Sequence, residues 1–137
     1  MRDITNRGDI DLLVEVFYGK AMDDDVIGYI FTDVAKLDLG EHLPVIADFW
    51  EMLLFRTVNF QEKYGRSPMS THIVLNRKEP LTREHFERWL KLFCGTVDEL
   101  FAGETAELAK FRAVSVAKTM MIRFSAESAG GIPVVQG

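Results

Sequence analysis

Apolar residues recur along this chain mostly at intervals of three and four positions rather than at every second position. That spacing collects apolar side chains on one face of an α-helix, whereas a half-buried strand alternates. We therefore predict an all-α fold. The pattern indicates four long helices, which run from Asn6 to about Asp23, from about Asp38 to Phe55, from Thr82 to about Leu100, and from about Glu104 to Ser125.

Three stretches lack so clear a period. The segment VIGYIFTDV is expected to form one or two helical turns, and Arg56 to Pro80 is expected to be irregular, with only MSTHIVL forming a short helix. Pro44 falls early in the second long helix, which predicts a late start or a kink, because proline beyond the first turn lacks the required N–H donor. We expect one domain over residues 1–125 and a flexible tail over residues 126–137.

Composition narrows the class of protein. The chain has 137 residues, 47% of them apolar, which suits one domain with one core. The net charge is -5, and the lysines and arginines are scattered among acidic residues rather than gathered into runs. This distribution argues against nucleic acid as a partner. No apolar run approaches the ~20 residues that span a bilayer, and the N-terminus has no apolar signal region, so we expect a cytoplasmic protein without a membrane partner. Cys94 is the only cysteine, which excludes an internal disulfide, a cysteine-rich zinc site and a covalently attached c-type haem.

Four polar aromatic residues lie among core-forming positions: Tyr18, His42, His72 and Trp89. His42 shares a helical row with Ile46 and Phe49, so we expect its imidazole to point towards the interior. Each of the four alone is more often a core residue satisfied by one hydrogen bond. Together they predict several hydrogen-bonding groups that converge on one apolar cavity.

Such a cavity is what a haem iron requires, since the iron needs one strong axial donor and a shaped, mostly dry pocket. His72 lies in the irregular segment between two long helices, where it is free to approach a metal. His85 is the competing candidate. Because His85 lies one turn before Trp89 on the same predicted helix, it would share the side of the pocket that Trp89 occupies.

Several sequence motifs match one known family. These are FYGK around Tyr18, GYIF around Phe31, EHLPVIADFWEMLL, the segment around His72, and EHFERWLKLF followed by VDELF and AELAKFRA. Over about residues 10 to 125 the chain resembles the group III truncated haemoglobins. The resemblance implies a truncated globin fold, a two-over-two helical sandwich, around haem b, which is iron protoporphyrin IX held without covalent links.

The resemblance also implies roles for individual residues. His72 would be the proximal iron ligand and therefore the metal-binding residue. The distal, ligand-stabilising residues would be Tyr18, Trp89 and His42. His42 would be either a gate or, in the absence of gas, a second iron ligand. Phe31, Ile46 and Phe49 would complete the cofactor-binding wall.

The function implied is the binding of dioxygen or another diatomic gas, such as nitric oxide or carbon monoxide. Two alternatives stay open at this point. One is a haem redox enzyme, either a nitric oxide dioxygenase or a peroxidase-like enzyme, which would need a separate reductase as a partner. The other is a cofactor-free helical interaction module in which the four polar aromatic residues are core residues.

Overall fold

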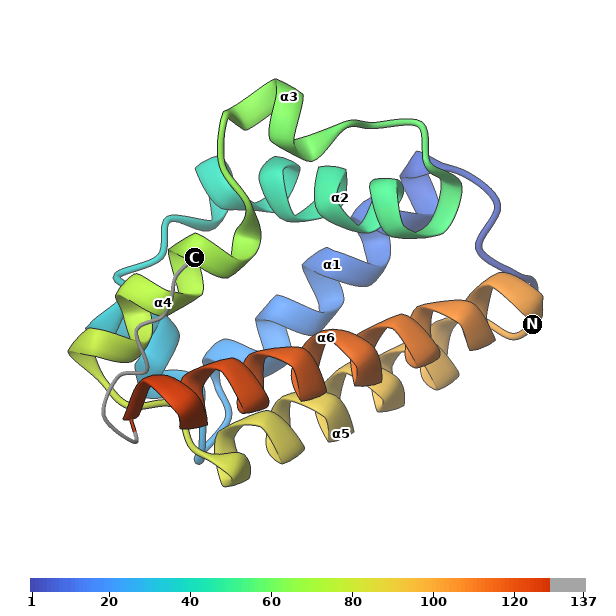
Figure 1. Ribbon diagram of the computed structural model, residues 1–137. Helices are drawn as coiled ribbons and strands as arrows, with labels where there is room; N and C mark the ends of the chain where they lie inside the picture. Colours follow the sequence, from blue (N-terminus) through green and yellow to red (C-terminus); the bar gives the residue numbers. More distant parts are fainter. Residues whose placement is uncertain (129–137) are drawn as a thin grey trace.

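The computed structural model describes residues 1–128 (Figure 1). Within this range all regular structure is helical and no strand occurs, which confirms the all-α prediction. No helix in the described range is long and apolar enough to cross a membrane. The elements are α1 (Arg7–Met22), the short π-helix η1 (Ile30–Val34), α2 (Leu39–Phe55), α3 (Phe60–Tyr64), α4 (Pro68–Lys78), α5 (Arg83–Leu100) and α6 (Glu104–Ser128).

The four long helices form two layers. Helices α1 and α2 pack against each other, and α5 and α6 form the second pair. Figure 1 shows α5 and α6 side by side below, with α1 and α2 above them. Because α1 packs on α5 and α2 packs on α6, the arrangement is the predicted two-over-two sandwich.

Three of the predicted helix starts are fixed by side-chain caps. The side chains of Asn6, Asp38 and Thr82 each accept a hydrogen bond from the amide three positions later, at 3.0, 3.4 and 3.3 Å. Each bond satisfies one of the N–H groups that have no partner inside the helix. The predicted starts of α1, α2 and α5 are therefore confirmed.

Contrary to the prediction, Pro44 does not delay the start of helix α2. Helix α2 begins at Leu39, directly after the Asp38 cap, and Pro44 lies inside it. The late start is therefore wrong, because the cap begins the helix a full turn before the proline. The carbonyl of Pro44 also accepts a hydrogen bond from the Arg7 guanidinium, at 3.3 Å.

The segment from Arg56 to Pro80 is more helical than predicted. Helix α3 was missed, and α4 is longer than MSTHIVL because it begins at Pro68 and ends at Lys78. Local capping explains both helices. Asn59 caps α3, which ends at Gly65 in the left-handed conformation (φ 68°), and Ser67 caps α4, with Pro68 in its first turn. Residues 126–128 of the expected tail belong to α6, and the rest of that tail lies outside the described residues.

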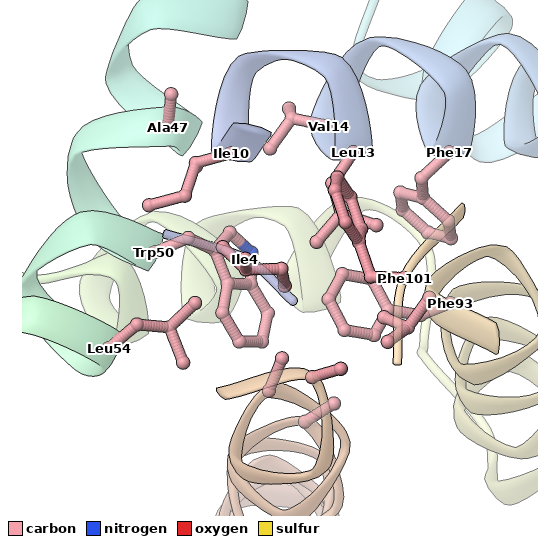
Figure 2. Packing of buried hydrophobic residues seen from close by; sticks show 14 of the residues in the cluster. Ile4, Ile10, Leu13, Val14, Phe17, Ala47, Trp50, Leu54, Phe93 and Phe101 are labelled. Atoms are coloured by element: carbon pink, nitrogen blue, oxygen red, sulfur yellow. The ribbon is translucent and has the colours of Figure 1, made fainter. Parts of the chain in front are cut away.

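The core lies between the two helical layers (Figure 2). The ring of Trp50 on α2 stacks on that of Phe93 on α5, with centroids 4.6 Å apart. The predicted stripe of α1 is confirmed, since all its members are buried: Ile10, Leu13, Val14, Phe17 and Ala21. This contact surface holds the two layers of the sandwich together.

Asp48 forms a buried polar link between three helices. Its Oδ1 accepts a hydrogen bond from Arg7 on α1 at 2.7 Å, and its Oδ2 accepts from Lys63 Nζ at 2.7 Å and from the Tyr64 hydroxyl at 2.6 Å on α3. Burial alone would raise the pKa of Asp48, but these three donors outweigh it and lower the pKa to about 2. The ionised carboxylate therefore fixes α3 against α1 and α2.

Candidate functional site

One cavity of about 380 Å³ opens between the helices, within the range of ~300–1,000 Å³ typical of cofactor and ligand sites. Its walls come from α1, η1, α2, α4, α5 and α6, and most of the lining side chains are apolar. The structure brings together on this cavity every site residue named from the sequence, which are Tyr18, Phe31, His42, Ile46, Phe49, His72 and Trp89.

His72 lies on α4 with one ring nitrogen already engaged. Its Nδ1 lies 2.7 Å from the carbonyl oxygen of Pro68, one helical turn earlier. A carbonyl only accepts, so Nδ1 carries the proton and Nε2 keeps its lone pair. Burial lowers the pKa of His72, which favours this neutral form. The arrangement is typical of a metal-ligating histidine, whose second nitrogen is oriented by a backbone carbonyl.

Tyr18 extends from α1 into the cavity between two other aromatic rings. Its ring meets Phe17 edge to face at 4.9 Å and Phe31 edge to face at 5.6 Å. The hydroxyl makes no hydrogen bond to any residue in the range 1–128. Burial raises the pKa of Tyr18 well above its ordinary value of 10, so the phenol stays protonated. Tyr18 is therefore an available hydrogen-bond donor at the cavity wall.

Trp89 on α5 is held by stacking rather than by a hydrogen bond. Its ring lies parallel to that of Phe93, at 5.4 Å and 10°, and meets the edge of Phe17 at 5.9 Å. Among the described residues, the indole N–H has no acceptor. An indole only donates, so Trp89 adds a second donor to the cavity wall.

His42 differs from the expectation in one respect. It lines the cavity, but its side chain is exposed rather than turned into the interior. The reason is its position in the first turn of α2, at the edge of the cavity, whereas Ile46 lies one turn deeper. Its Nδ1 lies 3.0 Å from the carbonyl oxygen of Asp38, which leaves Nε2 as an acceptor in the neutral ring.

His85, the competing ligand candidate, also lines the cavity, but both of its ring nitrogens have partners. Nδ1 accepts a hydrogen bond from the Thr82 amide at 3.0 Å, and Nε2 lies 3.2 Å from the hydroxyl of Tyr29. His72 has only one nitrogen occupied. The hydrogen bonds therefore favour His72 over His85 as a metal ligand.

Sequence reasoning missed two cationic residues in the lining, Arg66 and Lys78. Arg66 donates a hydrogen bond to the hydroxyl of Thr71, also in the lining, at 3.3 Å. Cations beside an apolar cavity suit a ligand that carries carboxylates. Arg66 and Lys78 flank the short helix expected in this segment, and recognition that α4 extends to Lys78 would have drawn attention to them.

The comparisons with known proteins identify the family of the chain. No family model matches the sequence. A curated relative, the group 3 truncated haemoglobin Ctb of Campylobacter jejuni, is 30% identical over 115 residues, which cover 82% of this chain and 85% of the relative. The chain belongs to the group III truncated haemoglobins. The crystal structure of a group III truncated haemoglobin from Campylobacter jejuni matches this truncated haemoglobin with a TM-score of 0.77 and 27% identity, over 96% of this chain and 99% of that chain.

Family membership implies a haem cofactor and a gas-binding role. It therefore favours a haem protein over the alternative prediction of a cofactor-free interaction module. The residues of the cavity fit a haem. The walls are mostly apolar, His72 offers one imidazole nitrogen, and Arg66 and Lys78 offer cations for the carboxylates of a porphyrin.

Proposed function

We propose that this truncated haemoglobin holds haem b, without covalent links, through Nε2 of His72, and binds dioxygen, nitric oxide or carbon monoxide beside Tyr18 and Trp89. The proposal rests on one observation. A single apolar cavity brings together the Nε2 lone pair of the partly buried His72 and two uncommitted donors, the hydroxyl of Tyr18 and the indole N–H of Trp89. When bound, the haem supplies an iron at which a diatomic gas is held reversibly.

The chain's own contribution begins at His72. The hydrogen bond from Nδ1 to the Pro68 carbonyl fixes the tautomer and restrains rotation of the ring, so that Nε2 is presented as a donor to the metal. Phe31, Ile46 and Phe49 form an apolar part of the cavity wall that would exclude water from around the haem. A dry site strengthens every polar interaction within it.

Tyr18 and Trp89 act on the gas. Dioxygen acquires partial negative charge when it accepts electron density, and it then becomes a good hydrogen-bond acceptor. A hydrogen bond to a charged acceptor contributes roughly 1.5–3 kcal/mol, so one well-placed donor slows release by about tenfold to a hundredfold. The Tyr18 hydroxyl has no hydrogen-bond partner among the described residues, so it can donate to the gas without first breaking another hydrogen bond.

His42 acts at the edge of the cavity rather than on the bound gas. Its neutral ring presents a lone pair at Nε2, so it cannot donate to the ligand unless it takes up a proton or breaks its bond to Asp38. Its exposed position suits a residue whose movement admits ligand. We therefore assign His42 to entry and Tyr18 and Trp89 to retention.

Absorption spectra of the purified, haem-reconstituted protein test the proposal. Ferric, ferrous and carbon monoxide forms of the wild type should have the bands of a histidine-ligated haem, and His72→Ala should lose or alter them. Free imidazole added to His72→Ala should restore the ligand field, which separates loss of the ligand from loss of the fold. A His72→Ala spectrum identical to that of the wild type would contradict the assignment. The redox alternatives and their reductase stay predictions.

A further inference from the structure

Tyr29 joins the start of η1 to the end of α4 and the start of α5, which lie far along the chain from it. Its hydroxyl donates a hydrogen bond to Glu79 Oε2 at 2.9 Å, 50 residues away, and lies 3.2 Å from His85 Nε2, 56 residues away. Tyr29 directly precedes η1, Glu79 is the C-cap of α4, and His85 lies in the first turn of α5. We call these three residues the Tyr29 clasp.

The directions of these hydrogen bonds form one consistent chain. Because the Thr82 amide donates to His85 Nδ1 at 3.0 Å, the proton of the neutral ring is on Nε2. Nε2–H then donates to the oxygen of Tyr29, and the O–H of Tyr29 donates to the carboxylate of Glu79. Burial and the neighbouring Glu79 raise the pKa of Tyr29, so its hydroxyl keeps the proton that the chain requires.

Each member of the clasp either lines the cavity or adjoins a residue that does. Ile30 and Phe31, which follow Tyr29, line the cavity, as does Lys78, which precedes Glu79, and His85 is a lining residue itself. Helix α4 also carries His72. Figure 1 shows the η1 segment and the C-terminal end of α4 at the same end of the molecule, and the bond from Tyr29 to Glu79 fixes them side by side.

We propose that the Tyr29 clasp closes this edge of the cavity and sets the rate at which the haem leaves. The inference rests on the proposed function, since it takes the haem as the occupant of the cavity. Loss of haem requires the wall around it to open, and the clasp is a direct polar connection between η1 and the helix that carries His72. Tyr29 is a positioning residue in this account, because it acts by holding α4 and η1 together.

Haem transfer from the loaded protein to an excess of an acceptor apoglobin measures the effect. Tyr29→Phe removes only the hydroxyl, and we expect it to speed haem loss about two- to tenfold, as the loss of one or two net hydrogen bonds implies. Glu79→Ala should have a similar effect, and the double variant should add little to either change. Thr57→Val is a matched control, because it removes a hydroxyl that donates to Glu51 away from the cavity lining. It should leave the rate of haem loss unchanged.

Amide hydrogen exchange provides a second measurement that needs no haem. In Tyr29→Phe, residues 26–37 and 76–82 should exchange faster together, with the core of α5 unchanged. Unchanged haem loss would overturn the inference and leave the proposed function intact. A wild-type protein that takes up no haem would overturn the proposed function instead, and unchanged exchange would then also remove the clasp.

Discussion

His42 and His72 hold their imidazole rings in the same way. In each, Nδ1 lies close to the carbonyl oxygen four residues earlier, at 3.0 Å for Asp38 and 2.7 Å for Pro68. Both rings therefore present Nε2 as a lone pair when neutral. They differ in exposure, since His42 is exposed at the edge of the cavity and His72 is partly buried in its wall. The proposed gate and the proposed iron ligand therefore share one local geometry and differ in exposure.

Replacement of His42 should change gas entry without changing gas release. In His42→Leu we expect the carbon monoxide association rate after flash photolysis to change several-fold, because an imidazole at the cavity edge is replaced by an apolar side chain. Dioxygen release should stay close to that of the wild type, since neutral His42 has no free N–H to donate. Glu41→Gln, at the neighbouring exposed position outside the lining, serves as the control. Association rates that match in all three proteins would exclude His42 as a gate.

Replacement of Tyr18 should change release. Tyr18→Phe removes the hydroxyl and keeps the ring packed between Phe17 and Phe31, so dioxygen dissociation should accelerate by about tenfold to a hundredfold. Stopped-flow displacement of dioxygen by carbon monoxide measures this rate. Tyr64→Phe removes a phenol that donates to Asp48 outside the cavity lining, and it should leave the rate unchanged. If Tyr18→Phe releases dioxygen at the wild-type rate, Tyr18 does not stabilise the ligand.

Asp48 should make the stability of the fold sensitive to acid. Its pKa of about 2 in the folded protein lies below the ordinary ~3.9, so its contribution is present above about pH 4 and is lost as the pH falls towards 2. Asp48→Asn should lower the free energy of unfolding by about 1–3 kcal/mol at pH 7, as measured by urea denaturation. The difference from the wild type should shrink between pH 4 and pH 2.

Asp11→Asn is the control for Asp48, because Asp11 pairs with the same Arg7 in an exposed i,i+4 pair. Its effect on the free energy of unfolding should stay below about 0.5 kcal/mol. An Asp48→Asn effect of the same small size at pH 7 would show that the link between α1, α2 and α3 contributes little to stability.

Gly103 precedes α6 in a conformation that suits glycine. Its φ is +143°, and an added Cβ would lie 2.4 Å from Cγ of Asp3, whose carboxylate accepts from the amides of Thr105 and Ala106. Gly103→Ala should lower the free energy of unfolding by about 1–3 kcal/mol through backbone strain and displacement of Asp3. Gly95→Ala, inside α5 with no atom within 4 Å of the new Cβ, should instead raise it by about 0.5–1 kcal/mol. Thermal unfolding of the two variants should therefore shift in opposite directions.

The sequence predicted the long helices well because their signals are local. The Asn6 and Thr82 caps and the apolar stripes of α1 and α5 mark these elements within a few residues of chain. Helix α3 has only five residues, too few to show a period, so its local signals are limited to its caps, Asn59 and Gly65. Its place against α1 and α2 depends on the contacts of Lys63 and Tyr64 with Asp48. No local period reports such a contact.

The part of the candidate site that follows from helical spacing was predictable, and the part that depends on contacts between distant segments was not. Tyr18 and Trp89 lie on strongly periodic helices, so their placement on the inner side followed from spacing. The exposure of His42 depends on where α2 starts relative to the edge of the cavity. The spacing of apolar residues within the helix does not predict that position. Likewise, Nε2 of His85 is occupied because Tyr29, 56 residues away in sequence, lies against it.

The stacked rings of Trp50, Phe93 and Trp89 have a practical consequence for watching this protein at work. The chain has two tryptophans, and both line the cavity. The tryptophan fluorescence of the protein therefore comes entirely from the residues of this cavity. A chromophore that enters the cavity should quench nearly all of that emission by energy transfer, so loading and release can be followed in real time without a label.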